Sequence, residues 1–317
     1  MGIGMLLAAL VVGAAGPAYL RRAVDAAARP GVALGAWIGT GVVFVTLLVA
    51  APVVMHVQPL RGFAPAATAA TACATMFDPA ASGVWPAAVR GVVVAVAVVA
   101  AVSAVAVVVA AMSRARRSAR AHARSLRSLV EATDHVDGVR VWWIADDEPV
   151  AYALPGAATR GFPGVGRRGS ASCGGTVVAS TALWDLGVER RRAVLDHEIA
   201  HLRGRHHVAV TSAAALRTVF SPVPLLRRAA AEVSVLAELA ADRRAALGAG
   251  GAAAVRGALG ELGAPAGRVV VLSSVPAGPR GTGPGLALAL VHAVSPAAIS
   301  AAAATTLVLG MCSALAG

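Results

Sequence analysis

The chain contains no lysine and few cysteines, and both shortages limit what kind of protein it is. Its three cysteines, Cys73, Cys173 and Cys312, are odd in number and far apart, so they provide neither a disulfide framework nor a cysteine zinc site. All 28 basic residues are therefore arginines, and they cluster beside apolar runs. This placement indicates membrane orientation and argues against direct nucleic-acid binding, despite the formal net charge of +12.

Apolar residues make up 57% of the 317 residues, and the mean hydropathy is +0.72. These values exceed those of an ordinary soluble domain and indicate a membrane protein. Four runs are long enough to cross a bilayer, at about residues 1–20, 34–57, 87–112 and 286–316. The first has no positively charged start and no clean cleavage site, so we expect a retained span and not a signal peptide.

Arginine positions orient the four expected spans. Arginines follow the first and third runs and precede the fourth, whereas the loop after the second run contains Arg61 and little else until Arg90. The positive-inside rule then places the N-terminus outside and residues 113–280 in the cytoplasm. We therefore expect a multi-pass protein of the plasma (inner) membrane. Its expected regions are 1–112 with three spans, a soluble domain at 113–280, and a last span at 281–317.

The soluble segment mixes helical and strand patterns. A basic helix over residues 114–130 either lies along the inner membrane surface or continues the third span. Val-rich runs predict strands at 139–144, 150–154 and 176–180. Helical patterns follow, one ending near Gly204 and two near 208–219 and 225–247. The stretches 248–267 and 273–285 are rich in Gly, Ala and Pro and predict a loose linker.

The sequence Asp-His-Glu-Ile-Ala-His at residues 196–201 places H-E-x-x-H within a helical pattern. His197 and His201 are four residues apart, so they share one face of the helix. Two imidazoles so placed can occupy two corners of a tetrahedral zinc site, leaving room for a third ligand and a water. Glu198 lies one step round the helix and can take a proton from that water as general base. The plain alternative is a surface helix with solvated histidines.

A third zinc ligand is expected from a second helix. Glu238 and Asp242 form E-x-x-x-D in the helix predicted over 225–247, and they share a face. Glu238 can complete the zinc shell, while Asp242 can accept the outer N–H of a ligand histidine and fix its tautomer.

Simpler interpretations of these carboxylates exist. Both can pair with nearby arginines such as Arg243 or Arg244, and Glu232 is a rival third ligand. However, Arg228 lies four residues before Glu232 and gives it an ordinary ion-pair partner. We therefore favour Glu238 as the ligand.

Peptide hydrolysis also requires a donor to the oxyanion. The candidates are His206, His207, Tyr152 and Arg243, and the sequence does not choose among them. The two histidines lie in a basic turn, where a solvated or membrane-facing position is the default. An edge strand beside the cleft would hold an extended peptide by main-chain pairing, and the sequence leaves open which strand that is.

The order of these features resembles the BlaR/MecR-type membrane metallopeptidases: three spans, a cytoplasmic domain with H-E-x-x-H and a later E-x-x-x-D, then a fourth span. The phrases Val-Val-Ala-Ser at 177–180 and Val-Leu-Asp-His-Glu at 194–198 are also similar to HtpX-type membrane peptidases. The resemblance is specific over about residues 139–247. It implies one Zn²⁺ per chain, with His197, His201 and Glu238 as its ligands. It also implies Glu198 as general base and Asp242 as the carboxylate that supports a ligand histidine.

The resemblance also implies a fold class and a function. The fold class is mostly α, a polytopic membrane protein with four transmembrane helices and an inserted cytoplasmic α+β zincin-like peptidase domain. The implied function is zinc-dependent cleavage of a cytoplasmic or membrane protein, with a BlaI-like winged-helix repressor as one substrate. BlaR and MecR carry an extracellular penicillin-binding domain after the fourth span, and this chain ends at Gly317, so we do not expect β-lactam sensing.

Two alternatives remain open from sequence. One is membrane-protein quality control of the HtpX type, and the other is a catalytically silent sensor or scaffold. A transporter is disfavoured because the spans contain no buried carboxylate or histidine pair of the kind that marks an ion path, His56 being at a span edge. The expected partners are the lipid bilayer and a protein substrate, and the oligomeric state is left open.

Overall fold

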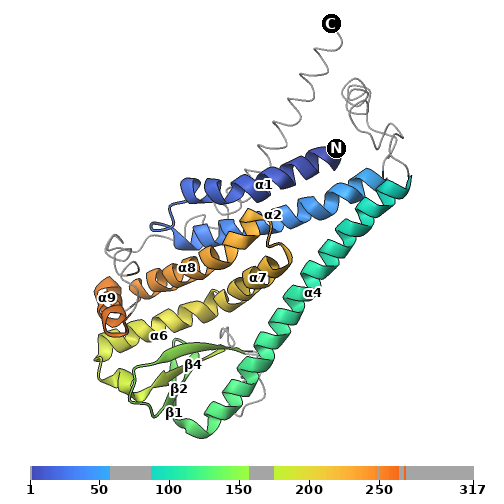
Figure 1. The fold of residues 1–317 in the computed structure, drawn as a ribbon. Helices are drawn as coiled ribbons and strands as arrows, with labels where there is room; N and C mark the ends of the chain where they lie inside the picture. Colours follow the sequence, from blue (N-terminus) through green and yellow to red (C-terminus); the bar gives the residue numbers. More distant parts are fainter. Residues whose placement is uncertain (1, 58–86, 157–174, 249, 264–267, 269–317) are drawn as a thin grey trace.

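The computed structural model describes residues 2–57, 87–156, 175–248, 250–263 and 268, which form a group of helices with one small sheet on one side of it (Figure 1). In chain order the elements are α1 (Gly2–Ala23), α2 (Pro30–Val57), α4 (Ala87–Leu126), the 3₁₀ turn η2 (Arg127–Leu129), β1 (Val130–Val136), β2 (Val139–Ile144), β3 (Ala151–Pro155), β4 (Gly175–Ser180), the 3₁₀ turn η3 (Thr181–Trp184), α6 (Val188–Arg203), α7 (His206–Val219), α8 (Pro224–Ala246) and α9 (Gly251–Glu261).

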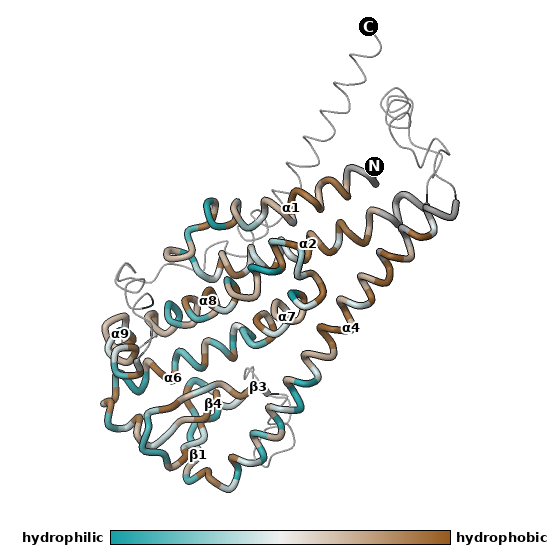
Figure 2. Tube along the Cα trace, viewed as in Figure 1, coloured by the Kyte–Doolittle hydropathy of each residue, from teal (hydrophilic) through white to brown (hydrophobic). Residues whose placement is uncertain are grey.

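Three stretches are long and apolar enough to cross a membrane. They are Met5–Ala23 in α1, Pro30–Ala51 in α2, and Val98–Leu129 across α4 and η2. Figure 2 shows apolar residues over much of α1, α2 and the first part of α4. A helix suits such a segment because it satisfies every backbone polar group internally. The first three expected spans are thus helical, while the expected fourth, at 286–316, lies outside the described residues.

The third apolar run and the basic segment after it form one continuous helix, α4, of 40 residues. Of the two placements expected for the basic segment, the structure has the one that continues the third run. The helix ends at Leu126, before the expected end at residue 130. Ala123 and Leu126 are buried together with Trp142 and Val178 of the sheet. The last turns of α4 are therefore anchored on the sheet.

The sheet has the strand order β1-β2-β4-β3, with β2 and β4 parallel and the other two pairs antiparallel. The three strands expected from sequence are present within one residue at each end, and β1 is an addition. β1 escaped prediction because its residues are mostly exposed and polar, without apolar alternation. The turn that joins it to β2 contains Asp137 and Gly138, both with positive φ, as a two-residue hairpin turn requires.

The inner face of α6 packs against the sheet. A continuous apolar core joins this helix to β2 and β4, and several of its members are fully buried. Burying aliphatic side chains at helical spacing fixes the rotation of α6 about its axis, and this rotation turns the opposite side of α6 toward α8. The core residues are Val139, Val141, Trp143, Val177, Ala179, Leu183, Val194, Leu195, Ile199, Leu202 and Ala258.

The linker prediction for residues 248–267 is wrong over most of its length, because residues 251–261 form helix α9. Ala254, Val255 and Leu259 of α9 are buried against Ala193 of α6 and Ala245 of α8. Small side chains allow these helices to approach closely, and alanine is the strongest helix former. A composition that suggested a flexible linker therefore forms a packed helix.

Helix α8, which contains Glu238 and Asp242, packs against the first two candidate spans (Figure 1). A Cβ on Gly13 of α1 would lie 3.2 Å from Val223, the residue just before α8, so this glycine permits a close approach. Further along, Glu232 pairs with Arg21 at 3.6 Å. Near the end of α8, Arg243 donates a hydrogen bond to the Ala28 carbonyl. One side of α8 therefore follows α1 from its middle to the loop after it.

Candidate metal centre

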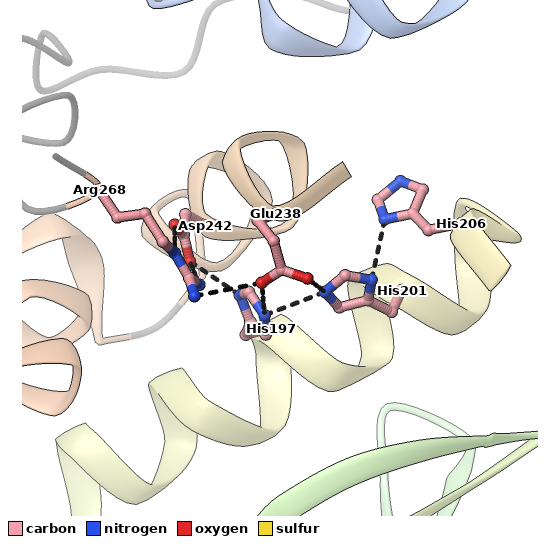
Figure 3. Close-up of polar contacts among 6 residues, drawn as sticks. All are labelled: His197, His201, His206, Glu238, Asp242 and Arg268. Atoms are coloured by element: carbon pink, nitrogen blue, oxygen red, sulfur yellow. Dashed lines mark hydrogen bonds and ion pairs between the residues drawn. The ribbon is translucent and has the colours of Figure 1, made fainter. Parts of the chain in front are cut away.

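Three side chains from α6 and α8 converge on one point (Figure 3). His197 and His201 are stacked one turn apart on α6, with their Nε2 atoms 3.0 Å apart. Glu238 of α8 faces both, with Oε2 at 3.5 Å from His197 Nε2 and Oε1 at 3.4 Å from His201 Nε2. Lone pairs that converge so closely are stabilised by a shared proton or cation. These three residues could hold a metal ion.

The donor atoms fit zinc in both chemistry and spacing. Imidazole nitrogen and carboxylate oxygen are normal zinc ligands, at about 2.0–2.2 Å from the ion. Ligands at that distance on the corners of a tetrahedron lie about 3.3 Å from one another. The two Nε2 atoms are 3.0 Å apart, and each lies 3.4–3.5 Å from a different carboxylate oxygen of Glu238, so the nearest donor contacts are close to this value.

The outer nitrogen of each histidine also has a partner. Asp242 is 1% exposed, and its Oδ1 lies 2.9 Å from His197 Nδ1. Because Asp242 accepts the Nδ1–H of His197, the Nε2 lone pair of this histidine is left facing Glu238. His201 Nδ1 lies 3.1 Å from Nδ1 of His206, a buried residue at the start of α7. Both rings are therefore oriented by neighbours on the far side from the converging atoms.

His206 reaches this position because of the turn between α6 and α7. Arg205 has a φ of 50°, in the left-handed region, which turns the chain sharply after α6. Gly204 precedes it, and a Cβ there would lie 2.3 Å from His206 Nε2. The turn therefore needs a glycine to make room for the imidazole. His206 was expected to be solvated or to face the membrane, and this default is wrong because the ring is buried against His201.

The titratable groups of the site, His197, Glu198 and His201, have pKa values shifted in different directions. Burial lowers the pKa of His197, but hydrogen bonds to Asp242 and Glu238 outweigh this and raise the pKa to about 9. Burial and the nearby His197 charge lower the pKa of His201 to about 4. Burial raises the pKa of Glu198 to about 7, partly offset by His197 and by a hydrogen bond with the Ala153 backbone. A carboxyl group with a pKa near neutrality can both accept and return a proton.

A groove of about 550 Å³ opens onto His197, Glu198, His201 and Glu238. One wall is β3, the last strand in the sheet order, which contributes Tyr152 and Ala153. The opposite wall comes from α7 and α8 and includes Val210, Ser234 and Val235. Among the described strands, β3 is thus the edge strand beside the cleft that the sequence left unassigned.

The four expected oxyanion donors lie in different places. Tyr152, His206 and His207 line the groove, although His206 is occupied by His201. The Tyr152 hydroxyl also lies 2.8 Å from His122 Nε2 of α4. Arg243 donates to the Ala28 carbonyl and is not among the residues that line the groove.

The acidic residues of α8 pair with arginines other than those expected from the sequence. Glu232 pairs with Arg21 of α1 and not with Arg228. Asp242 and Glu238 pair with Arg268, one of the arginines that precede the expected fourth span. Arg268 lies 26 residues after Asp242, beyond the range of helical i,i+4 pairing. No local sequence signal could have identified this pairing.

Comparison with known proteins agrees with this geometry. Residues 168–256 match the sequence model described as Peptidase family M48, a segment that contains β4, α6, α7 and α8. No curated protein and no solved structure matches the chain. The family match indicates a metallopeptidase, and the three converging side chains of α6 and α8 are a possible metal site for one.

Proposed function

We propose that this chain is a zinc-dependent endopeptidase of the membrane, with His197, His201 and Glu238 as the zinc ligands. The observation that carries the proposal is the convergence of these three donors at zinc-like separations, with Glu198 beside them on the same groove. When bound, zinc would polarise the scissile carbonyl and lower the pKa of a water.

Glu198 serves as general base in this proposal. Its carboxylate lies in the groove, and its pKa of about 7 lets it take a proton from the attacking water and pass it to the leaving amine. Asp242 and His206 hold the two histidine rings in place through their Nδ1 atoms. The ligand residues therefore need little reorganisation during the reaction.

The substrate is held in an extended conformation along β3. Among the described strands β3 has only β4 as a neighbour, so a peptide can pair with its outer edge beside Glu198 as an added strand. Tyr152 and His207 line the same groove and are the two donors available to the developing oxyanion. The apolar side chains of Val210 and Val235 face the substrate from the other wall.

The membrane arrangement is part of the proposal. α1, α2 and the first part of α4 span the plasma membrane with the N-terminus outside, and residues 281–317 add a fourth span. Residues 113–280 are the peptidase region on the cytoplasmic side, with the start of α8 reaching beside the middle of α1. The arginines in the last turn of α1 and in the second half of α4 mark the inner surface. Glu232 pairs with Arg21 at this level, and Glu238 lies six residues further along α8, which is about 9 Å of helix rise.

A site this close to the inner surface favours peptide bonds near a membrane anchor. The substrate class is therefore a membrane protein with a cytoplasmic segment, as in HtpX-type quality control. The BlaI-like repressor implied by the sequence resemblance is the second candidate, and a repressor gene adjacent to this one would favour it. A catalytically silent sensor is disfavoured because the proposed base and ligands are all present together.

The first experiment measures zinc in detergent-purified protein by elemental analysis, for the wild type and three variants. We expect about one zinc per chain in the wild type, a sharp loss in Glu238→Ala, and retention in Glu232→Ala, the matched control on the same helix. Glu198→Ala should keep its zinc but lose cleavage of a fluorogenic peptide library.

Each result has a definite meaning. A well-folded wild type without zinc would refute the peptidase and favour the silent scaffold. Zinc retained in Glu238→Ala but lost in Glu232→Ala would show that the third ligand is Glu232. Cleavage retained in Glu198→Ala would refute the assignment of the base.

A further inference from the structure

Arg268 forms ion pairs with two carboxylates of the proposed metal centre, Glu238 and Asp242 (Figure 3). Its Nε donates to Asp242 Oδ2 at 2.8 Å, and a terminal nitrogen donates to Oδ1 at 2.6 Å. The other terminal nitrogen lies 3.2 Å from Glu238 Oε2. One guanidinium group therefore holds two carboxylates that are one helical turn apart on α8.

Both carboxylates act on the same histidine. Asp242 Oδ1, which accepts from Arg268, is also the oxygen 2.9 Å from His197 Nδ1. Glu238 Oε2, which faces Arg268, is also the oxygen 3.5 Å from His197 Nε2. Arg268 therefore fixes the carboxylates on both sides of the His197 ring without touching the ring itself.

The charge balance also depends on Arg268. Glu238 and Asp242, together with Glu198 when it is ionised, bring three negative charges to a site where Asp242 is 1% exposed and the Arg268 side chain 21% exposed. With neutral histidines, a divalent cation offsets two of these charges, and Arg268 offsets the third. Burying an uncompensated charge is costly, so Arg268 allows three carboxylates and one zinc ion to coexist here.

We propose that Arg268 is a positioning residue of the metal centre, which sets zinc affinity by holding Asp242 and Glu238 in their ligand-supporting orientations. This inference rests on the proposed zinc site, and Arg268 lies outside the segment 168–256 that matches the peptidase family. Arginine is required for this role because only a planar guanidinium can bind Asp242 through two parallel hydrogen bonds and still reach Glu238.

A purely structural ion pair would give different results. It would only tie Arg268 to α8, so its loss would lower thermal stability without changing the affinity of the folded protein for zinc. A positioning role instead predicts that the metal environment changes in the folded protein. Zinc affinity and the absorption spectrum of the cobalt-substituted protein distinguish these cases, because both report on coordination.

The test uses full-length protein in detergent, with Arg268→Gln, Arg268→Lys and the control Arg244→Gln. Arg244 is exposed and follows Asp242 by two residues on α8. Its loss therefore removes one positive charge near the site but leaves the two hydrogen bonds, the fork, between Arg268 and Asp242. Zinc dissociation constants are measured by competition with a chromophoric chelator. We expect affinity to fall about 10–100-fold in Arg268→Gln, the range for loss of an outer-shell partner. The Co²⁺ spectrum should shift in this variant, and Arg244→Gln should match the wild type.

Arg268→Lys keeps the charge but loses the fork, so its affinity should lie between those of Arg268→Gln and the wild type. If Arg268→Gln does not fold, Arg268→Lys is the variant that tests the proposal. Wild-type zinc affinity and an unshifted Co²⁺ spectrum in Arg268→Lys would then overturn it. A wild type that takes up no zinc would refute the proposed function itself. Normal zinc binding in the wild type together with unchanged affinity in a folded Arg268→Gln would refute only the role of Arg268.

Discussion

Gly204→Ala tests whether the turn between α6 and α7 controls the metal centre. Gly204 has helical backbone angles, φ −76° and ψ −8°, so alanine causes no backbone strain. The obstacle is the side chain of His206, because a new Cβ would lie 2.3 Å from its Nε2 and 2.6 Å from its Cδ2. Ordinary contact begins at about 3.4 Å, so the imidazole must move by roughly 1 Å.

This displacement has a size that can be estimated. Moving the ring by about 1 Å stretches the 3.1 Å contact between His206 and His201 beyond hydrogen-bonding distance. Losing that bond costs about 0.5–1.5 kcal/mol, and replacing glycine without backbone strain returns about 0.4–1 kcal/mol. Global stability should therefore change by less than about 1 kcal/mol. Zinc affinity should fall about tenfold, because His201 loses the partner that orients it.

The assay combines zinc competition titration with chemical denaturation of the same preparations. Gly260→Ala is the control, since a Cβ on Gly260 in α9 would meet nothing within 4 Å, and it should leave zinc affinity unchanged. His206→Ala removes the same contact without a clash and should match Gly204→Ala in affinity. Wild-type zinc affinity in both Gly204→Ala and His206→Ala would refute the role given to His206.

Further predictions concern the groove, the packing of α8 and the metal. Tyr152→Phe and His207→Ala test the two candidate oxyanion donors by steady-state kinetics on one fluorogenic peptide. The variant that removes the donor should lower kcat about 10²–10³-fold with little change in KM. A kcat close to the wild-type value in both variants would exclude both residues. Leu225→Ala should lower the free energy of unfolding by about 2–5 kcal/mol, because Leu225 is fully buried against α1 and α2. Its control, Val235→Ala, removes a side chain that is 57% exposed and should cost less than about 0.5 kcal/mol; similar losses in the two variants would contradict the packing. Chelation should abolish cleavage, and zinc at 100 times its dissociation constant should restore it and add about 2.7 kcal/mol of stability in thermal unfolding. Full activity in the presence of excess chelator would rule out a metal-dependent reaction.

The parts of the fold in which apolar residues recur at a regular spacing could be predicted from the sequence. His197 and His201 could be placed on one helix face because apolar residues around them recur at helical spacing, and α6 has this face. Glu238 and Asp242 could be placed together for the same reason, although the sequence could not show that they face α6. β2 and β4 were recognisable because both are short and rich in β-branched residues, with two tryptophans in β2 as well.

The remaining features depend on packing between distant segments. β1 pairs with β2 through its backbone, and an exposed polar strand has no period to detect. α9 is rich in Ala and Gly, a composition shared by flexible linkers and tightly packed helices. The partnership of Arg268 with Asp242 and the burial of His206 beside His201 arise only when the helices assemble. They could not be predicted from local sequence patterns.

The double use of α8 limits how this protein can be divided. Its buried residues Leu225, Leu226 and Val233 share one core with α1 and α2, while Glu238 and Asp242 complete the metal centre further along the same helix. A fragment that begins after α2 would therefore expose a wide apolar surface on the helix that carries Glu238, the proposed third ligand. Expression of residues 113–280 alone should give an aggregating product, and folding of the metal centre is inseparable from assembly of the N-terminal helices.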